Sequence, residues 1–393
     1  MRILHIISNM KPDKGGPQEA VRMMLRDAPA GCESEVLTLD EPDAPYLHDA
    51  PFTVHALGGD RKGGYSPKLV PWLRTNRSRF DGVILHGMWE YHSLAVLRTI
   101  AGRIPYIVYA HGMLDPYFKR ASPLKHAKKW LYWLPVQYWV LRRALRVVFT
   151  TATERDLAAK SFWLHRWNAT VIGLGADTPP PDLARCSETF FNLCPSARNK
   201  PYLLFLGRIN PKKGCDILLD AFVAVAAQQP EPHLVMAGPD SVHWRSSLQT
   251  VATRAGISDR VHWPGMLTGE AKWGAFAASE AFVLTSHQEN FGIAVVEALA
   301  CGKPVLITKP INIADDLASD GCALVEPDTL SGAKQLLTRW LVLSPAERAT
   351  MSARALTTVA TRYDMRKNTS ALIDLFAASA AQRTGTLAEV HEA

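Results

Sequence analysis

The sequence lacks several patterns that would assign it to a common class of protein. Its six cysteines form no C-x-x-C pair, which argues against a structural zinc site and for a reducing, cytosolic setting. No apolar run is long enough to cross a membrane, and the apolar core of the N-terminal MRILHIIS is too short for a signal peptide. The dinucleotide motif G-x-G-x-x-G is absent, and His86, Glu90 and His92 do not have the H-E-x-x-H spacing of zinc proteases. We therefore expect structural roles for these two histidines.

The composition fits a globular protein with two domains. A chain of 393 residues can form two cores, and 47% apolar with 21% charged residues are ordinary globular values. The formal net charge of +7 allows an anionic ligand or an anionic membrane surface as a partner, but it does not by itself indicate nucleic acid.

One stretch, residues 285–307, organises the rest of the chain. The apolar run 281–285 predicts a strand, residues 286–290 a polar loop, and residues 291–300 a helix with an apolar face. Gly302 and Pro304 end this helix, after which another buried strand begins. Such a βαβ unit places a ligand at the carboxyl end of its first strand.

Two glutamates flank the start of this predicted helix. Glu289 lies in the loop and Glu297 lies inside the helix, while Gly292 in the first turn would let a ligand approach free backbone N–H groups at the positive end of the helix dipole. This arrangement suits a phosphate, with carboxylates nearby for hydroxyl groups, as in a sugar nucleotide. From these residues alone, a surface loop before an ordinary amphipathic helix is an equal alternative.

A second loop, residues 207–214, has the same setting between a predicted strand (202–206) and a predicted helix (215–227). Arg208 can fork onto two phosphate oxygens and Lys213 supplies a point charge. Two cations and two glycines in a strand–loop–helix context favour a pyrophosphate site over a solvated turn.

Two loops in the N-terminal half are weaker candidates. Gly15 and Gly16 follow the first predicted strand and precede a helix, which is a geometry that brings backbone N–H groups to an anion, although a plain turn is the alternative. His111 follows the predicted strand 104–110, where its side chain would point into a ligand crevice or merely cap a turn.

Residues 119–146 carry many cations and aromatic rings but no acidic residue. Cations with amphipathic aromatics suit an interface with anionic lipid, and Pro135 would kink a helix there. A core-packed helix with a solvated basic face is the open alternative. The basic residues are Lys119, Arg120, Lys125, Lys128, Lys129, Arg142, Arg143 and Arg146.

The quoted motifs together resemble the retaining glycosyltransferases of family four. These motifs are the Gly207-Arg208 and Lys213-Gly214 pairs, the ENFG run that begins at Glu289, and the spacing of Glu289 from Glu297. The resemblance covers nearly the whole chain and implies an α/β GT-B fold, in which two Rossmann-like domains face each other across a cleft. It also implies a C-terminal helix that crosses back to the N-terminal domain.

The Pro-rich, polar composition of residues 176–200 indicates the domain boundary. The expected parts are an acceptor-side domain over 1–180, a linker over 181–200 and a nucleotide-sugar-binding domain over 201–362. A crossing-back helix over 363–381 and a disordered tail over 382–393 complete the expected organisation.

The resemblance also implies roles for individual residues. Arg208 and Lys213 would bind the donor pyrophosphate, Glu297 the ribose and Glu289 the hydroxyls of the donor sugar. His111 would contact the same sugar, and a glycine loop would face the donor phosphate. The expected catalytic residues are Arg208, Lys213, Glu289 and His111, and the expected substrate-binding residues are Gly15, Gly16, Asn290, Phe291, Gly292, Ile293 and Glu297.

The implied activity is transfer of a hexose from a nucleoside-diphosphate sugar to a hydroxyl of a glycan or lipid-linked saccharide in cell-surface polysaccharide assembly. Because the sequence has no D-x-D triplet, no metal or other cofactor is expected. The expected location is the cytoplasm, with a peripheral position at the inner face of the membrane if residues 119–146 bind lipid. A sugar-nucleotide 2-epimerase and a non-catalytic nucleotide-binding protein are the alternatives, and the sequence specifies neither base, sugar nor acceptor.

Overall fold

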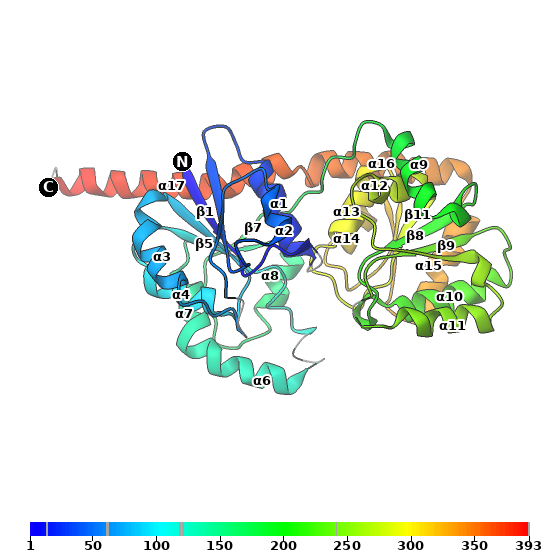
Figure 1. The fold of residues 1–393 in the computed structure, drawn as a ribbon, viewed down its shortest axis with the longest axis horizontal. Coiled ribbons are helices and arrows are strands. Elements are labelled where there is room, and N and C mark those ends of the chain that lie inside the picture. The colour runs from blue at the N-terminus through cyan, green and yellow to red at the C-terminus, as the bar shows by residue number, and fades with distance from the viewer. Residues whose placement is uncertain (13–14, 60–62, 118, 120–121, 241, 392–393) are drawn as a thin grey trace. The chain divides into compact units, whose positions relative to one another are not determined.

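The computed structural model describes residues 1–12, 15–59, 63–117, 119, 122–240 and 242–391, and the chain forms two compact units (Figure 1). The first unit holds residues 1–174 and 365–393, and the second holds residues 175–364. The first unit is therefore built from two separate pieces of the chain, and the second unit is continuous.

The first unit is built on a seven-stranded sheet in the order β3-β2-β1-β4-β5-β6-β7, in which every neighbouring pair is parallel. Its central strands are buried along almost their whole length, as in parallel sheets with both faces covered, and are mostly apolar apart from His5 and His86. The strands are β1 (Arg2–Ile6), β2 (Glu33–Thr38), β3 (Val54–Ala56), β4 (Gly82–His86), β5 (Tyr106–Tyr109), β6 (Arg146–Phe149) and β7 (Ala169–Val171). The helices are α1 (Gly16–Arg26), α2 (Pro45–His48), α3 (Leu69–Asn76), η2 (Arg77–Arg79), α4 (Tyr91–Thr99), α6 (Pro123–Tyr132), η3 (Trp133–Gln137), α7 (Tyr138–Arg143), α8 (Ala152–Ala158) and α17 (Met365–His391).

The second unit is built on a six-stranded parallel sheet in the order β10-β9-β8-β11-β12-β13. Figure 1 shows α10, α11 and α15 on one face of this sheet and α9, α12, α13 and α16 on the other. The strands are β8 (Tyr202–Leu206), β9 (His233–Ala237), β10 (Val261–Gly265), β11 (Ala281–Leu284), β12 (Val305–Thr308) and β13 (Ala323–Glu326). The helices are α9 (Leu183–Leu193), η4 (Pro195–Ala197), η5 (Pro211–Lys213), α10 (Cys215–Ala226), α11 (Arg245–Arg254), η6 (Ser258–Arg260), α12 (Gly269–Ala278), α13 (Ile293–Ala300), α14 (Ala314–Ser319), α15 (Leu330–Val342) and α16 (Pro345–Arg362).

Both sheets have the strand order of a Rossmann fold. In the first sheet the chain runs outward from β1 to β3 and then starts again with β4 on the other side of β1. In the second sheet it runs outward from β8 to β10 and then starts again with β11 on the other side of β8. The point of reversal is therefore between β1 and β4 in the first sheet and between β8 and β11 in the second. Parallel α/β sheets bind ligands outside the carboxyl ends of the strands at this point of reversal. The predicted α/β fold class with two Rossmann-like domains is confirmed.

The linker predicted over 181–200 is instead mostly helical and belongs to the second unit. Helix α9 buries Cys186 and Phe190 on one face and packs against α12. Gly274 of α12 makes this contact close, because a Cβ atom there would lie 1.9 Å from the carbonyl oxygen of Cys186. Composition misplaced the boundary because Cys186 and Phe190, four residues apart, give this polar segment an apolar helical face.

The C-terminal helix α17 belongs to the first unit. Its Phe376 lies against Gly82 of β4, where a Cβ atom would come within 2.6 Å of the aromatic ring. The helix continues to His391, so the tail predicted to be disordered from residue 382 is helical over nearly all its length, and residues 392–393 lie outside the described residues. The physical reason is that α17 is already formed before residue 382. Extending an established helix fixes one residue at a time and avoids the cost of forming a new helix nucleus.

The basic aromatic stretch has two different parts. Helix α6 has no buried residue, whereas Trp133, Val140 and Leu141 in the following turns are buried in the core. Pro135 lies in a π-helical turn, which accommodates the lost hydrogen bond between α6 and α7. The core-packed alternative therefore describes the second part fully, and it describes α6 on one side, where Trp130 and Tyr132 pack against the core. Arg120 lies outside the described residues.

Candidate active site

The two loops singled out in the second unit meet at its point of reversal. One follows β8 and the other follows β11, and these strands are neighbours. Gly214 has φ of 62°, and a Cβ atom there would lie 2.1 Å from the carbonyl oxygen of Thr285. The Thr285 hydroxyl donates to the carbonyl of Gly214 at 2.8 Å, and the His287 N–H donates to the carbonyl of Lys212 at 2.9 Å. The glycine of the Lys213-Gly214 motif therefore brings the two backbones into contact.

The start of the Arg208 loop is fixed in a similar way by the loop after β9. Gly238 has φ of 145°, and a Cβ atom there would lie 1.9 Å from the carbonyl oxygen of Gly207. The Ile209 N–H donates to the carbonyl of Pro239 at 2.9 Å. Arg208 itself is exposed, and no partner for its guanidinium appears among the described residues. The loop is thus ordered while its arginine is available to a ligand.

Lys213 and Glu289 form an ion pair between these two loops. The Lys213 Nζ donates to Glu289 Oε1 at 2.5 Å, and the Ser286 hydroxyl donates to the same oxygen at 3.1 Å. Both side chains are largely buried, with 16% and 13% exposed. Burial alone would raise the pKa of the Glu289 carboxyl, but the nearby Lys213 and Lys212 and the two hydrogen bonds outweigh it and lower this pKa. Glu289 is therefore a carboxylate at neutral pH.

The second oxygen of the same carboxylate has a different environment. Within the part of the chain that the structure describes, no hydrogen bond reaches Glu289 Oε2. The backbone of Glu289 is held on both sides, because its N–H donates to Pro310 and its carbonyl accepts from Asn312. The carboxylate is thus fixed by one oxygen and can accept a hydrogen bond on the other.

Glu297 forms a second ion pair that the sequence did not predict. It is 5% exposed on α13, and its Oε1 accepts from Lys272 Nζ of α12 at 2.6 Å. The Lys272 ammonium also lies 4.7 Å from the centre of the Trp273 ring. Lys272 lies in no recognisable motif, and only the contact between α12 and α13 brings it to Glu297.

The first turn of α13 lies beside these groups and is open at its N-terminus. Gly292 is its N-cap residue, with φ of 77° and no side chain capping the N–H groups. Gly292, Ile293 and Ala294 are partly exposed. Phe291 is 4% exposed and packs edge-on against Tyr363, so its ring belongs to the core and only its backbone can serve a ligand. Asn290 accepts a long hydrogen bond, 3.5 Å, from Asn312.

The predicted residues of the first unit lie at the carboxyl edge of its sheet. Gly15 is the N-cap of α1 with φ of 107° and no side-chain cap, and Gly16 begins the helix. His111 follows β5 with φ of 49°, in the left-handed region that a non-glycine residue rarely occupies. Glu154 holds this turn, since its Oε1 accepts from the Gly112 N–H at 2.6 Å and its Oε2 accepts from Thr150. Glu154 was not predicted; the Thr151-x-x-Glu154 pattern marks it only as a residue at a helix start, and its contact with Gly112 comes from the fold.

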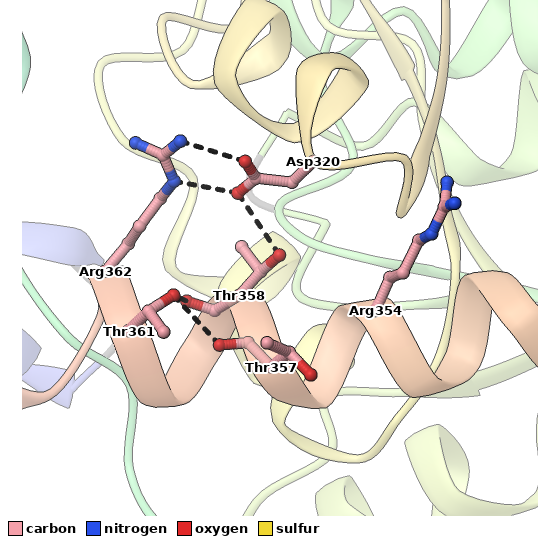
Figure 2. Close-up of a pocket in the computed structure, with 6 residues that line it drawn as sticks. All are labelled: Asp320, Arg354, Thr357, Thr358, Thr361 and Arg362. Carbon is pink, nitrogen blue, oxygen red and sulfur yellow. Dashed lines mark hydrogen bonds and ion pairs between the residues drawn. The ribbon is translucent and has the colours of Figure 1, made fainter.

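Another hollow in the second unit contains none of the predicted residues (Figure 2). Arg362 donates to both oxygens of Asp320 at 2.7 and 2.9 Å, and the Thr358 hydroxyl donates to the same carboxylate at 3.2 Å. Figure 2 shows Arg354 apart from this group. These contacts join the end of α14 to α16, so we assign the cluster a structural role.

Neither a metal site nor a membrane span is found in the described residues. No group of three or more histidine, cysteine, aspartate or glutamate side chains could hold an ion there, and no helix there is long and apolar enough to cross a bilayer.

Comparison with known proteins identifies the family. The profile of the family described as "Glycosyl transferases group 1" matches residues 188–358, and that of the "Glycosyl transferase 4-like domain" matches residues 15–175. The chain is 31% identical over 266 residues to a D-inositol 3-phosphate glycosyltransferase of Saccharomonospora viridis, a match that spans 64% of this chain and 59% of that relative.

Two further proteins match along almost their whole length. A GDP-mannose:cellobiosyl-diphosphopolyprenol alpha-mannosyltransferase of Xanthomonas campestris is 26% identical, with 96% of this chain and 97% of the relative covered. The structure of Anabaena HepE, solved in complex with UDP and glucose, superposes with a TM-score of 0.75 at 19% identity and covers 96% of this chain and 100% of that one. The two matched profiles, the paired Rossmann sheets and these relatives show that this chain belongs to the GT-B glycosyltransferases of family four.

Proposed function

We propose that the protein is a metal-independent retaining glycosyltransferase. It would move a hexose from a nucleoside-diphosphate sugar to a hydroxyl of a saccharide acceptor. The observation that carries this proposal is the Lys213–Glu289 pair, which places a cation and a half-open carboxylate beside the uncapped start of α13. The same small site can thus bind a phosphate and the hydroxyl groups of a sugar.

The leaving group needs stabilisation as its charge develops. When the bond from the sugar C1 to the β-phosphate oxygen breaks, its electron pair stays on that oxygen. Lys213, the exposed Arg208 and the N–H groups at the start of α13 are fixed donors of the kind that stabilise such charge without a metal. The acceptor oxygen then forms its bond to C1 on the same face, and its proton moves to the departing phosphate.

The donor sugar and ribose would be bound by the two glutamates. Glu289 Oε2 is open to a sugar hydroxyl, whereas Oε1 is held by Lys213 and Ser286. Glu297 would accept a hydrogen bond from a ribose hydroxyl, with Lys272 keeping its carboxylate in place. His111 of the first unit would contact the donor sugar, and Gly15 and Gly16 would face its phosphates.

A lipid-linked acceptor in cell-surface polysaccharide assembly fits the surface around α6, which we call the basic aromatic face. Leu124, Leu131 and Trp163 are 82%, 81% and 80% exposed, which is unusual for such large apolar side chains. The cations of the face are Lys125, Lys128, Arg142 and Arg143, all exposed. Apolar groups beside cations suit an anionic lipid surface, where a lipid-linked saccharide would be presented by the membrane to a cytoplasmic enzyme. The printed name of the Xanthomonas relative, a transferase acting on a polyprenol-linked sugar, supports this choice.

The proposal is tested by incubating the full chain with UDP- and GDP-hexoses, with and without a polyprenol-linked or free oligosaccharide, and following the sugar by NMR. A new glycosidic bond with the anomeric configuration of the donor is expected. Conversion of the free nucleotide sugar to its 2-epimer would indicate the alternative enzyme. Tight nucleotide binding with neither reaction would indicate a binding protein, and an inverted product would disprove retention.

A further inference from the structure

Three histidines form a hydrogen-bonded row that ends at the predicted sugar contact His111. His5 lies on β1, His86 ends β4, and His111 follows β5, which are three neighbouring strands at the point of reversal of the first sheet. His5 Nδ1 lies 3.0 Å from His86 Nε2, and His86 Nδ1 lies 3.0 Å from His111 Nε2.

The rings meet edge to edge. The ring centres are 5.2 and 5.3 Å apart, whereas the nearest nitrogens are only 3.0 Å apart, and the ring planes are inclined by 9° and 25°. Neighbouring rings therefore lie side by side and point their nitrogens at each other. The Tyr109 ring lies against His111 at 4.7 Å, and its hydroxyl is tied to the carbonyl of Ile172. The orientation of the last imidazole is thus fixed by its neighbours.

Each ring of the row is neutral at physiological pH. Burial lowers the pKa of His5 to about 3 and that of His111 to about 3. Burial also lowers the pKa of His86 well below its ordinary value, and His5, His111 and His92 add to this shift. A neutral imidazole has one N–H donor and one bare nitrogen that accepts. Because both nitrogens of His86 are engaged, one must donate and the other accept, so all the protons of the row point the same way.

The ends of the row decide between the two directions. His5 is 1% exposed, and no acceptor for its Nε2 appears among the described residues, so an N–H there would have almost no room for a partner. A buried N–H without an acceptor is among the rarest features of folded proteins. His111 is partly exposed, so an N–H on its Nδ1 can reach water or a ligand. The protons therefore point from His5 through His86 toward His111.

We infer that His5 and His86 are positioning residues that hold His111 in the tautomer with its proton on Nδ1, so that His111 offers the donor sugar a hydrogen-bond donor. The contact with the sugar rests on the proposed function, whereas the tautomer does not. An N–H can bind any sugar oxygen, including a ring oxygen or the carboxylate of a uronic acid. A bare nitrogen could bind only a hydroxyl, so the row widens the class of donor sugars that this position accepts.

Long-range 1H–15N correlation spectra of the full chain, labelled with [15N]histidine, report the tautomer directly and need no substrate. The His111 signals are assigned by their loss in His111→Gln. We expect the Nδ1–H pattern for His111 in the unsubstituted protein at neutral pH. An Nε2–H pattern in that spectrum would overturn the inference even if neither His86→Phe nor His5→Phe folded.

Variants then test whether the row is the cause. In His86→Phe, His111 loses the donor to its Nε2, so its spectrum should shift toward the Nε2–H form; His5→Phe should act in the same direction. The matched control is His262→Phe, which breaks a similar 3.0 Å contact with His233 in the second unit and should leave the His111 pattern unchanged. An unchanged pattern in folded His86→Phe would refute the positioning role. A transferase assay that shows no activity would count against the proposed function but not against the tautomer of His111.

Discussion

Lys213 and Glu289 lie 76 residues apart in the sequence and are joined by a 2.5 Å hydrogen bond between two loops that follow neighbouring strands. The pair holds one carboxylate oxygen and leaves the other for a ligand. It also keeps the ammonium beside the open first turn of α13. This arrangement leads to the first three predictions.

Truncating the cation should slow the reaction. In Lys213→Ala the developing phosphate charge loses a fixed donor, so kcat should fall by a factor on the order of 10²–10³, and Arg208→Ala should have an effect in the same direction. Turnover at saturating donor is the measurement. Arg254→Ala, which removes an exposed cation in the last turn of α11 before the amino end of β10, is the matched control. A near-normal rate in Lys213→Ala would refute the assignment.

The two glutamates should differ in what they affect. Hydrogen bonds that strengthen as the glycosidic bond breaks change turnover more than ground-state binding, so Glu289→Gln should mainly lower kcat. Glu297→Gln should mainly weaken nucleoside diphosphate binding, because the ribose is shared by every donor with that nucleotide. Calorimetry with the diphosphate and rates at saturating donor separate the two effects. The reverse outcome would exchange the two roles.

The ion pair should also make stability depend on pH. The pKa of Glu289 is lowered in the folded protein from its ordinary value of 4.5, so its stabilising contribution is complete above pH 4.5 and is lost as the pH falls through the lower folded value. The Tm difference between the unsubstituted protein and Glu289→Gln should therefore be largest near neutral pH and shrink in acid. A difference that grows below pH 4.5 would contradict the sign of the shift.

Activity should not require a divalent metal. Fixed cations and helix N–H groups are proposed to stabilise the leaving group, so EDTA should leave the transfer rate largely unchanged. The rate is measured before and after chelation and again after adding magnesium or manganese. Loss of activity that either ion restores would mean that the site has been misread.

The basic aromatic face should bind anionic vesicles in a salt-dependent manner. Replacing Lys125, Lys128, Arg142 and Arg143 by glutamine should weaken binding by about 1 kcal/mol per cation. Lys129 is excluded because its ammonium lies 4.4 Å from the centre of the Trp89 ring, and burial lowers its pKa to about 8.

The control for this experiment removes four exposed or partly exposed cations of the second unit, Arg185, Arg254, Lys334 and Arg354. Vesicle sedimentation at increasing salt is the measurement. Equal weakening in both variants would show a general charge effect, and no binding by the unsubstituted protein would remove the membrane from the proposal.

The sequence was sufficient for the fold class and for the loops that form the candidate site. Strand–loop–helix order, glycines at positive φ and the spacing from Glu289 to Glu297 are local patterns, and the structure places these loops at the point of sheet reversal. The ion-pair partners were not predictable in this way. Lys272 meets Glu297 only because α12 packs beside α13, and Glu154 reaches Gly112 from 42 residues away.

Errors arose where composition conflicted with helical spacing. The prolines before α9 indicated a linker, yet Cys186 and Phe190 on one face of that helix are buried against α12. Phe291 was predicted to bind substrate because it stands between Asn290 and Gly292, and this stays a prediction for its backbone. Its ring packs on Tyr363, which is 72 residues away in the chain. His86 was expected to be structural, and its neighbours His5 and His111 give that role a more specific meaning.

The return of α17 to the first unit affects the order in which the protein can be completed on the ribosome. Domains generally fold as units while synthesis proceeds from the N-terminus. Here residues 175–364 form a continuous unit that can fold as soon as it emerges, whereas the first unit begins earlier but is finished later. Until Phe376 emerges, its place against Gly82 stays uncovered, so the nascent chain carries an exposed apolar surface through the whole synthesis of the second unit.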